Sequence, residues 1–361
     1  MRVLVTGGAG FIGANVATAL AGRHSDWELI ALDNLHRRGS ELNVERLRER
    51  AVRFVRGDVR SPEELRSVGE IDALIECSAE PSVLAGLDGS PDYVIGTNLT
   101  GAYNCLELAR LRNAYFVFLS SSRVYPVAGL ADLRLLESST RFELADEQPL
   151  AGASAAGISE AFPLTGARTL YGATKLAAEL LIEEYRAAYG LRAVVDRCGV
   201  IAGPWQMGRV DQGVFAYWLL AHHFGWPLAY IGYGGSGKQV RDLLHVDDLV
   251  ALVEEQLLDP LRWDGVVANV GGGRECSLSL LETTALCEEI TGKRCVIETV
   301  VAARRGDVPV YISDCSRLYE LTEWRPQHGP GQILADVHAW VQSHEAPLRR
   351  SLAGAVGPGG G

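Results

Sequence analysis

The chain has 361 residues, of which 47% are hydrophobic and 22% charged, a composition typical of globular proteins. Its formal net charge is -11, and its basic residues form only short pairs such as Arg37-Arg38, which argues against a nucleic-acid partner. No apolar run is long enough to span a membrane, and Met1 directly precedes the first apolar strand, so we expect neither a membrane partner nor a signal peptide. The seven cysteines are scattered without a C-x-x-C pair, which predicts reduced thiols in a cytoplasmic protein and no metal site.

The first predicted strand leads directly into a cluster of glycines. Val3, Leu4 and Val5 form the apolar run, and a helical pattern opens at Phe11. The glycines between them fit both G-x-G-x-x-G and G-x-x-G-x-x-G, through Gly7, Gly8, Gly10 and Gly13. In such a turn one glycine allows the bend, one lets the backbone approach a pyrophosphate, and the last lets the helix pack on the strand. The alternative is a glycine turn that only packs a helix on a strand.

A second predicted strand, residues 27–32, ends on Asp33, twenty positions after Gly13. An acidic side chain there accepts hydrogen bonds from the adenosine ribose of NAD and repels the 2′-phosphate of NADP. Arg37 and Arg38 follow closely enough to bind that phosphate, although a solvated basic loop is the simpler interpretation. The order of strand, turn, helix, strand and acid predicts a dinucleotide site with NAD as the cofactor.

Strands and helical patterns continue to alternate up to residue 196. We expect strands at 52–56, 73–77, 115–119 and 192–196, and helices at 41–49, 61–68, 98–111 and from Tyr171 onward. This alternation predicts an α/β fold with a parallel, doubly wound sheet. After the strand at 52–56, Asp58 either accepts a hydrogen bond from an adenine amino group, with Val59 stacking nearby, or caps the next helix. After the strand at 73–77, the small residues Ser78 and Ala79 suit a diphosphate and a ribose.

The rest of the chain is less regular. Residues 130–169 form a long connection that we expect to be partly ordered over the active site. Residues 234–242 predict a hairpin or a loop, and the later elements are a helix at 249–258, strands at 266–270 and 295–300, and helices at 279–292 and 333–343. Residues 346–361 end in glycines and predict a disordered tail.

Tyr171 and Lys175 stand four residues apart on a predicted helix, so both side chains project from one face. A lysine beside a phenol lowers the pKa of the phenol, and the phenolate can then act as a general base. Ser121, at the end of a neighbouring strand, can hydrogen-bond the same substrate oxygen. A Y-x-x-x-K pair on a surface helix has no catalytic meaning alone, but the preceding dinucleotide pattern favours the catalytic interpretation. We therefore predict Ser121, Tyr171 and Lys175 as catalytic residues of a hydride-transfer site.

Several motifs together carry a family resemblance: T-G-G-A-G-F-I-G, Asp33-Asn34-Leu35, Gly57-Asp58, Asn98, S-S-S-R-V-Y, Tyr171-x-x-x-Lys175, Arg197, Gly203-Pro204, G-K-Q-V-R-D-L-L-H-V-D-D, N-V-G-G-G and Arg305-Gly306-Asp307. Over roughly residues 1–326 the sequence resembles the extended short-chain dehydrogenase/reductase superfamily, in its nucleotide-sugar epimerase and dehydratase branch. Within that branch it is most similar to the CDP-paratose 2-epimerase (CDP-tyvelose epimerase) group. The segments that indicate this group are 210–214, 237–245, 277–282 and Thr140-Arg141-Phe142.

The resemblance implies a Rossmann-type NAD-binding domain at residues 1–197 plus about 240–262. It implies a smaller α/β nucleotide-sugar-binding domain at 198–239 and 263–345. With the patterns above, the expected NAD contacts are Gly7, Gly10, Phe11, Ile12, Gly13, Asp33, Asn34, Asp58, Val59, Ser78, Ala79, Asn98, Tyr171 and Lys175. The expected substrate contacts are Glu80, Ser122, Arg123, Val200, Gln212, Arg241 and Arg305. By resemblance Arg241 grips the diphosphate and Arg305 lies near the nucleotide; the alternative for Arg241 is an ion pair with Asp242 or Asp248.

The sequence departs from the family pattern at positions that bear on the reaction. Glu76-Cys77-Ser78 stands where the family usually has His-Leu-Ala, Pro126 replaces a glycine, and Val200 replaces an asparagine three residues after Arg197. Dehydratases of the branch place Asp-Glu directly after the catalytic Ser/Thr, where this chain has Ser122-Arg123. Without an acid to protonate a leaving hydroxyl, elimination is disfavoured.

We therefore predict an NAD-dependent epimerase of a nucleotide-linked sugar that acts through a transient keto-sugar and has no net redox change. The resemblance suggests C2 as the carbon and CDP as the carrier, and it leaves C4 and UDP, GDP or dTDP open. The alternatives are an NAD(P)-dependent nucleotide-sugar dehydrogenase or reductase and a non-catalytic dinucleotide-sensing protein. The family also implies a homodimer formed through the helices at 98–111 and 171–189.

Overall fold

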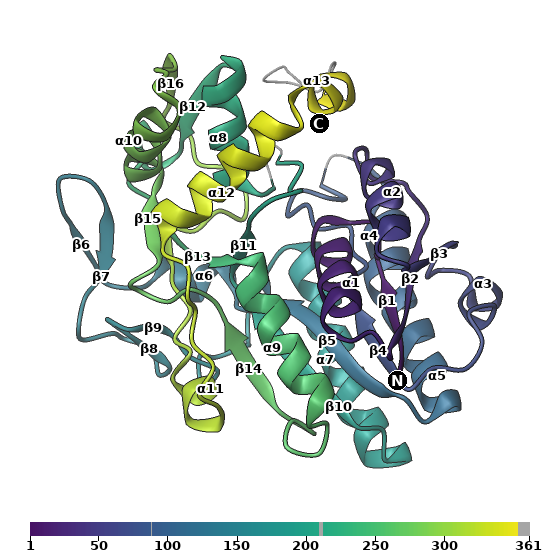
Figure 1. Cartoon of the computed structure of the whole chain (residues 1–361). Coiled ribbons are helices and arrows are strands. Elements are labelled where there is room, and N and C mark those ends of the chain that lie inside the picture. Colours follow the sequence, from purple (N-terminus) through teal and green to yellow (C-terminus); the bar gives the residue numbers. More distant parts are fainter. Residues whose placement is uncertain (88, 209–211, 353–361) are drawn as a thin grey trace. The chain divides into compact units, whose positions relative to one another are not determined.

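The computed structural model describes residues 1–87, 89–208 and 212–352. Its contacts divide the chain into two compact units, whose elements are labelled in Figure 1. Unit 1 comprises Met1–Val124, Thr169–Cys198 and Leu249–Ala268, and unit 2 comprises Tyr125–Arg168, Gly199–Asp248 and the residues from Asn269 on. Residues 125–168 and 240–248, which we expected in the first domain, thus belong to unit 2, and residues 263–268, expected in the second domain, belong to unit 1.

Unit 1 is organised around a single sheet. Among the described residues, seven strands form it in the order β14-β10-β5-β4-β1-β2-β3. Their bounds are β1 (Arg2–Thr6), β2 (Glu28–Asp33), β3 (Arg53–Arg56), β4 (Ala73–Glu76), β5 (Tyr115–Ser121), β10 (Ala193–Cys198) and β14 (Val267–Val270). The neighbours from β10 to β3 pair in parallel, and Val5 lies opposite Ala31 on β2 and Ile75 on β4. The strand order reverses between β1 and β4, which is where open α/β sheets bind their ligands.

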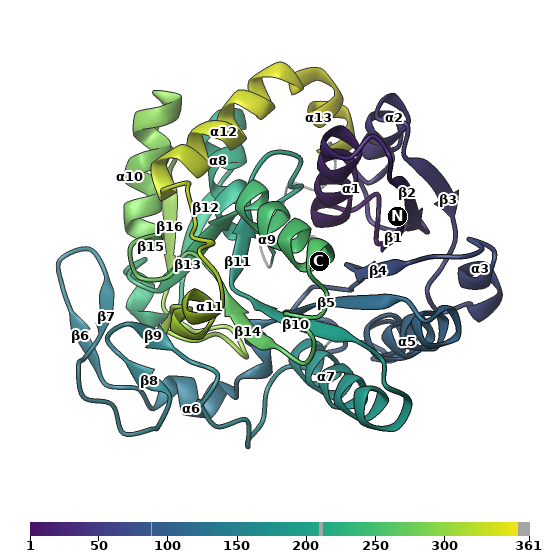
Figure 2. The ribbon, with the colours of Figure 1, turned by 60° about the horizontal axis from the view of Figure 1, so that its bottom comes forward.

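Helices cover both faces of this sheet, as predicted (Figure 2). α1 (Phe11–Arg23) and α9 (Val246–Leu258) lie on one face, and α5 (Gly101–Arg112) and α7 (Leu170–Tyr189) lie on the other. The remaining helical elements of unit 1 are α2 (Glu41–Glu49), α3 (Pro62–Arg66), α4 (Asp92–Ile95), the π-helix η1 (Gly96–Thr100) and the 3-10 helix η2 (Ser122–Val124). The predicted α/β, doubly wound parallel fold is therefore confirmed.

The core of unit 1 follows from the apolar runs that predicted its strands. All seven residues of β5 are buried, as expected for a central parallel strand that is covered on both faces. Phe116 and Phe118 of this strand pack in one cluster with Leu4, Leu106 and Ile182, which come from β1, α5 and α7. Burying such a side chain fully contributes about 1.5–3 kcal/mol, so this cluster fixes the carboxyl ends of the strands that carry the candidate site.

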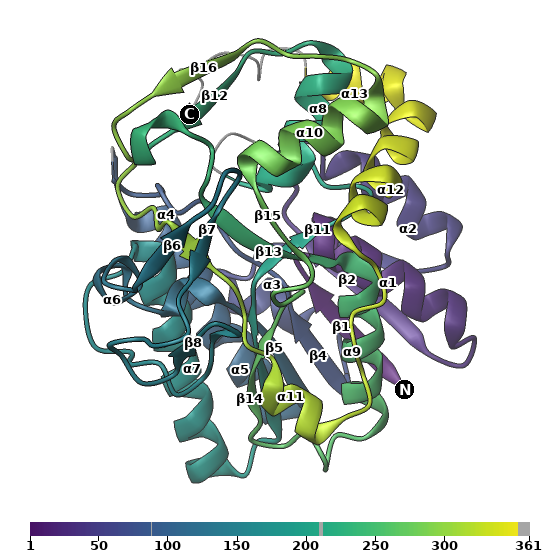
Figure 3. The same cartoon turned by 90° about the vertical axis from the view of Figure 1, so that its left-hand side faces the viewer.

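Unit 2 contains smaller sheets and a group of helices. β11 (Val200–Ala202), β13 (Val240–His245), β15 (Ser277–Ser279) and β17 (Val310–Tyr311) form one sheet, and β12 (Leu228–Ile231) pairs with β16 (Ile297–Val300). Two hairpins come from residues 125–168: β6 (Leu135–Glu137) with β7 (Phe142–Leu144), and β8 (Ala153–Ser154) with β9 (Gly157–Ile158). α8 (Val214–Phe224), α10 (Leu280–Thr291) and α12 (Pro330–Ser343) pack together (Figure 3). The other helical elements are α6 (Val127–Ala131), η3 (Tyr233–Gly235), α11 (Ser316–Leu321) and α13 (Glu345–Leu352).

Two sequence predictions in unit 2 are wrong in part. Residues 240–242, predicted as part of a hairpin or loop, open strand β13, which pairs with three other strands. Residues 346–352, predicted as disordered, belong to helix α13, because Leu348 and Leu352 bury their side chains. The rest of that predicted tail, 353–361, lies outside the described residues. Within the described ranges, every helix is too short or too polar to cross a lipid bilayer.

Candidate active site

The glycine turn after β1 brings three backbone segments too close together for side chains. Gly7 adopts a left-handed φ of 60°, and an added Cβ there would lie 2.8 Å from the carbonyl oxygen of Cys77. A Cβ on Gly13 would lie 2.3 Å from the carbonyl oxygen of Gly7. Gly10 is the N-cap of α1, and within the described residues no side chain caps this helix. The first amides of α1, from Phe11 to Gly13, therefore keep donors for an anion, and the bare backbone lets a pyrophosphate approach.

Asp33 ends β2 beside this turn. Its carboxylate accepts hydrogen bonds from the amides of Ala9, at 3.1 Å, and Leu35, at 2.7 Å. Burial raises the pKa of Asp33, and the hydrogen bonds from these amides oppose the rise. Hydrogen bonds thus hold the carboxylate of Asp33 against the glycine turn. The spacing of Gly13 and Asp33 predicted that these two features lie side by side.

Asp58 is the centre of a small polar network at the end of β3. Its carboxylate accepts hydrogen bonds from Arg60 Nε at 2.9 Å and from Asn34 Nδ2 at 2.9 Å, and these bonds hold the pKa of Asp58 below its usual value. The helix-cap interpretation of Asp58 is wrong, because Ser61 is the N-cap of α3 and accepts from the amide of Glu64 at 3.4 Å. Val59, predicted near adenine, is 5% exposed and belongs to the core cluster.

The loop after β4 is fixed by Asn98 of the π-helix η1. Asn98 Oδ1 accepts from the amide of Glu80 at 2.7 Å, and Asn98 Nδ2 donates to the carbonyl of Glu80 at 3.0 Å. Ser78 is buried in this loop, and its hydroxyl has no hydrogen-bond partner within the described residues. The carboxylate of Glu80 accepts from the amide of Ser82 at 3.1 Å. Asn98 therefore shapes the loop of small residues that we predicted beside the cofactor.

The first turn of α7 lies directly on the backbone that follows Ser121. Thr169 caps α7, accepting from the amide of Gly172 at 3.2 Å. An added Cβ on Gly172 would lie 2.0 Å from the carbonyl oxygen of Arg123, so this contact requires glycine. The hydroxyl of Ser121 accepts from the amide of Arg123 at 3.2 Å. Tyr171, which precedes Gly172, and Ser121 are thus carried by two segments in van der Waals contact.

Lys175 reaches from α7 between the ends of two strands. Its Nζ donates to the carbonyl of Leu119 on β5 at 2.8 Å and lies 3.3 Å from Glu76 Oε2 on β4. Burial alone lowers the pKa of Lys175, but attraction to Glu76 and to Tyr171 and the hydrogen bond to Glu76 raise it above the ordinary value of 10.5. The lysine of the predicted pair Tyr171 and Lys175 therefore contacts a carboxylate, Glu76, which the sequence showed only as a departure from the family pattern.

A second buried ion pair lies one turn further along α7. Arg197 on β10 donates to the carboxylate of Glu179, with Nη2 at 2.7 Å from Oε2. The hydroxyl of Ser120, next to Ser121, also donates to Glu179. Sequence analysis did not predict this pair, although Glu179 stands four positions after Lys175 and therefore on the same helix face.

Four of the remaining predicted substrate residues lie in unit 2, and two lie in unit 1. Arg241 on β13 donates through Nη2 to Asp307 Oδ1 at 2.7 Å and to the carbonyl of Val308 at 2.6 Å, so both expected ion-pair alternatives, Asp242 and Asp248, are wrong. Arg305 is exposed in the segment before β17. Val200 is half-buried on β11, and the side-chain nitrogen of Gln212 is buried without a hydrogen bond in the described part of the chain. Ser122 and Arg123 are in unit 1, on η2.

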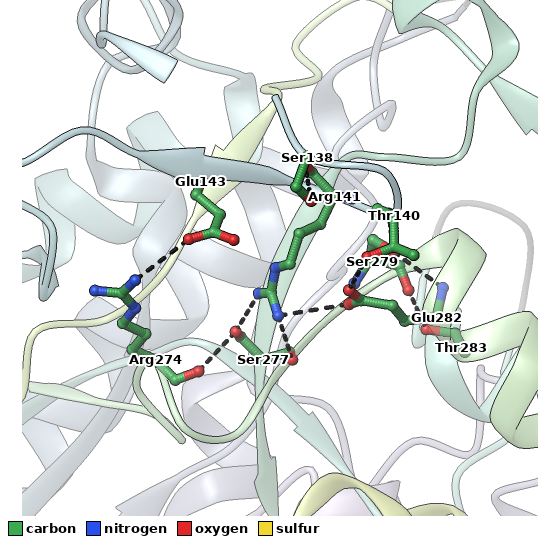
Figure 4. Close-up of polar contacts among 9 residues, drawn as sticks. All are labelled: Ser138, Thr140, Arg141, Glu143, Arg274, Ser277, Ser279, Glu282 and Thr283. Atoms are coloured by element: carbon green, nitrogen blue, oxygen red, sulfur yellow. Dashed lines mark hydrogen bonds and ion pairs between the residues drawn. The ribbon is translucent and has the colours of Figure 1, made fainter. Parts of the chain in front are cut away.

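Two of the segments that indicated the CDP-paratose 2-epimerase group contact each other in unit 2 (Figure 4). Thr140, between β6 and β7, donates to Glu282 Oε1 at 2.8 Å, and Arg141 Nη1 lies 3.5 Å from Glu282 Oε2. The hydroxyl of Ser279 donates to the carbonyl of Thr140 at 2.8 Å, and Ser279 forms a capping box with Glu282 at the start of α10. The hairpin is therefore fastened to the N-terminus of α10 by side chains of both segments.

The doubly wound sheet, the uncapped helix behind a glycine turn and the acid at the end of β2 define a dinucleotide-binding protein of the α/β class. A model of the NAD dependent epimerase/dehydratase family matches residues 3–271. The chain belongs to this family.

Known proteins resemble the chain over nearly its whole length. It is 28% identical over 357 residues to a CDP-paratose 2-epimerase of Salmonella typhi, covering 95% of this chain and 100% of that protein. It is 30% identical over 329 residues to a dTDP-glucose 4,6-dehydratase of Mycobacterium tuberculosis, covering 91% and 89%. A solved UDP-glucose 4-epimerase of Thermus thermophilus in complex with NAD is similar with a TM-score of 0.74 at 26% identity, covering 95% of this chain and 99% of that chain.

These findings confirm the superfamily and the cofactor predicted from the sequence. The family is NAD dependent, and the described residues fit the cofactor, since α1 begins without a side-chain cap behind the glycine turn and Asp33 lies beside that turn. Both epimerases and a dehydratase occur among these relatives. The chain is thus an enzyme of the nucleotide-sugar epimerase/dehydratase type.

Proposed function

We propose that the protein is an NAD-dependent epimerase of a nucleotide-linked sugar, with C2 of a CDP-linked deoxysugar as its target. The observation that carries this proposal is the packing of α7 on η2, which brings the segments of Tyr171 and Ser121 together. The two residues that follow Ser121 on η2 are Ser122 and Arg123. Neither of these two side chains is an acid that protonates a leaving hydroxyl. The likeness to the CDP-paratose 2-epimerase of Salmonella typhi supports the choice of carrier and carbon.

In the proposed mechanism Tyr171 takes the proton of the sugar hydroxyl at the reacting carbon. The hydroxyl of Ser121 donates a hydrogen bond to the same oxygen and orients it, and the ammonium of Lys175 stabilises the negative charge on the phenolic oxygen. Bound NAD supplies the acceptor and the donor for the hydride of that carbon. The keto-sugar then turns its other face toward the nicotinamide, and the hydride returns to that face. Tyr171 gives the proton back to the oxygen, so the reaction has no net redox change.

In this proposal the nucleotide end of the substrate is held by unit 2. Arg241 is half-buried, and its guanidinium carries the fixed positive charge that suits a diphosphate. Arg305, Gln212 and Val200 are the other unit 2 residues assigned to the substrate, and Glu80, Ser122 and Arg123 are those of unit 1. The NAD contacts are those given for the glycine turn, Asp33 with Asn34, Asp58 with Val59, and the loop fixed by Asn98.

The second candidate is a net nucleotide-sugar dehydrogenase or reductase, which needs an exchangeable cofactor. Mass spectrometry of the small molecules released by denaturing freshly purified protein separates the two. Stoichiometric NAD supports the epimerase, whereas an empty protein or bound NADP supports the oxidoreductase. A trace of retained sugar nucleotide would also identify the carrier.

The decisive assay uses CDP-, UDP-, GDP- and dTDP-sugars deuterated at the carbon under test, without added NAD. An epimerase yields the other epimer with the deuterium retained on the same carbon, since the hydride leaves and returns within the site. Loss of water from the sugar would instead indicate a dehydratase, and accumulation of NADH with an oxidised sugar would indicate a dehydrogenase. Either result contradicts the proposal.

We further propose a homodimer formed through α5 and α7. These helices expose large apolar or aromatic side chains at Tyr103, Leu111, Leu180 and Tyr189, whose exposed fractions run from 44% to 59%. Sedimentation of the wild-type protein and of a Leu180→Glu variant tests the dimer; a wild-type monomer contradicts it.

We also propose a cytoplasmic location for the protein. The cysteines are all free, which supports a reducing compartment.

A further inference from the structure

The chain uses lysine very sparingly. Of its 34 basic residues only Lys175, Lys238 and Lys293 are lysines. Lys238 and Lys293 each have a backbone carbonyl as a partner and are partly exposed, whereas Lys175 is 2% exposed. Burial disfavours the charged form of a lysine strongly, so a buried lysine keeps its proton only if an acceptor compensates it.

Among the described residues, the hydrogen-bond acceptors of Lys175 include one carboxylate, whose charge can compensate that of the lysine. Nζ lies 4.5 Å from the ring centre of Phe118, 2.8 Å from the carbonyl oxygen of Leu119 and 3.3 Å from Glu76 Oε2. The titratable groups that face it are Glu76 and Cys77 at the end of β4, Cys105 on α5 and Tyr171 on its own helix. Burial raises the pKa of the Cys77 and Cys105 thiols, which therefore stay neutral. Burial also raises the pKa of Glu76, but attraction to Lys175 and the hydrogen bond from Lys175 oppose this rise, so Glu76 is the group that carries the compensating charge.

Glu76 is itself closed off from any ligand. Its side chain is 1% exposed, and its second oxygen, Oε1, is buried without a hydrogen bond among the described residues. The surrounding side chains therefore shield it from ligands, and the charged group that it contacts is Lys175.

We propose that Glu76 is a positioning residue that keeps Lys175 protonated and fixed between the ends of β4 and β5. An ammonium has three donors, of which Leu119 and Glu76 take two, and these two bonds hold Nζ in place. This inference rests on the proposed function for the role of Lys175, but the protonation of Lys175 is measurable without any substrate. The family usually has a histidine at the position of Glu76. In this chain the carboxylate at that position compensates the charge of Lys175.

The charge can be separated from the hydrogen bond by substitution. Glu76→Gln keeps an oxygen acceptor for Nζ and removes the charge, and Glu76→Asp keeps the charge. Asp196→Asn is the matched control, because Asp196 is a fully buried carboxylate on β10 of the same sheet that hydrogen-bonds Gln256 rather than a lysine.

The measurement is a pH titration of the NAD-loaded protein labelled with [ε-13C]lysine, followed by NMR. Three lysine signals are expected, and Lys238→Arg and Lys293→Arg assign them. In the wild type and in Asp196→Asn, Lys175 should titrate above the ordinary lysine value of 10.5. In Glu76→Gln its midpoint should fall by about 1–3 pH units, and in Glu76→Asp most of this fall should disappear. An unchanged midpoint in Glu76→Gln overturns the proposal.

If Glu76→Gln does not fold, the wild-type titration alone still decides, because a Lys175 midpoint below that of Lys238 and Lys293 overturns the proposal. Where epimerase turnover is present, the alkaline limb of kcat should move down with the Lys175 midpoint in Glu76→Gln, while KM for the nucleotide sugar stays unchanged. A structural defect would instead lower kcat at all pH values without moving the limb. If no epimerisation is found in the wild type, the proposed function fails, and the titration still tests Glu76.

Discussion

The ion pairs beneath α7 in unit 1 and the ion pair of Arg241 in unit 2 differ in how far they are shielded from water. In unit 1 the side chains of Lys175 and Glu76 are 3% and 1% exposed, and those of Arg197 and Glu179 are 7% and 6% exposed. In unit 2 the side chains of Arg241 and Asp307 are 13% and 20% exposed. The deeper pairs fix charges before a ligand arrives, as electrostatic preorganisation of a reacting centre requires, whereas the shallower pair leaves its arginine within reach of solvent and of ligands.

This difference suggests a division of labour that kinetics can test. Changes in the buried cluster of unit 1 should act on kcat or on folding, because its charged groups are held by the protein and lie beside the proposed catalytic residues. Changes at Arg241 should act on KM, because its guanidinium binds a part of the substrate that does not react.

The largest expected effect on turnover comes from Tyr171→Phe. Removing the phenolic oxygen removes the proposed general base, which typically contributes roughly 10²–10⁴-fold to the rate. We expect kcat for epimerisation to fall by this amount while the amount of NAD released on denaturation stays at the wild-type level. A variant with full turnover would exclude Tyr171 as the base, and a variant that has lost its NAD would show a binding defect instead.

Arg197→Met should have the largest effect on stability. The change leaves the Glu179 carboxylate buried without its ion partner, which typically costs about 3–5 kcal/mol in the free energy of unfolding. Equilibrium unfolding in urea measures it. The double variant Arg197→Met with Glu179→Leu should recover much of the loss, since both charges are then gone. Similar stability for the single variant and the wild type would show that solvent reaches this pair.

Arg241→Met tests the shallower pair of unit 2. Hydrogen bonds to a charged group contribute about 1.5–3 kcal/mol, so we expect KM for the nucleotide sugar to rise by roughly 10- to 150-fold with little change in kcat. Asp307→Asn is the matched control, because it frees Arg241 from its carboxylate partner and should not raise KM. A fall in kcat equal to the rise in KM would place Arg241 in the chemical step rather than in binding.

Local patterns predicted the parts of the site that lie within one turn or one helix. The glycine spacing from Gly7 to Gly13, the acid at Asp33 and the pair Tyr171 and Lys175 each depend on periodicity over a few residues, which a sequence shows directly. Ser121 was predicted from its place at the end of a neighbouring strand, and the family resemblance then added the arginines of the substrate site. The roles of all these residues stay predictions.

The interactions that sequence analysis missed join residues that are far apart in the chain. Lys175 and Glu76 are 99 positions apart, and Arg241 and Asp307 are 66 apart. A departure from the family pattern pointed to Glu76 but not to its partner, because only the pairing of β4 with β5 brings Glu76 near α7. Helix α13 was missed for a different reason: the final glycines dominate the composition of 346–361 and conceal the apolar positions Leu348 and Leu352.

The smallest expected effect concerns a charged network of unit 1 that lies near its surface. The hydrogen bonds from Arg60 and Asn34 depress the pKa of Asp58 in the folded state below its ordinary value of 3.8. Their contribution to stability is therefore present above pH 3.8 and is lost as the pH falls below that value. Because the Arg60 side chain is 43% exposed, we expect less than about 1 kcal/mol from this pair. Urea unfolding of the wild type and of Asp58→Asn should show a difference at neutral pH that shrinks in acid. A difference that grows in acid would contradict the depressed pKa, and one of several kcal/mol at neutral pH would mean that this pair is as well shielded as those beneath α7.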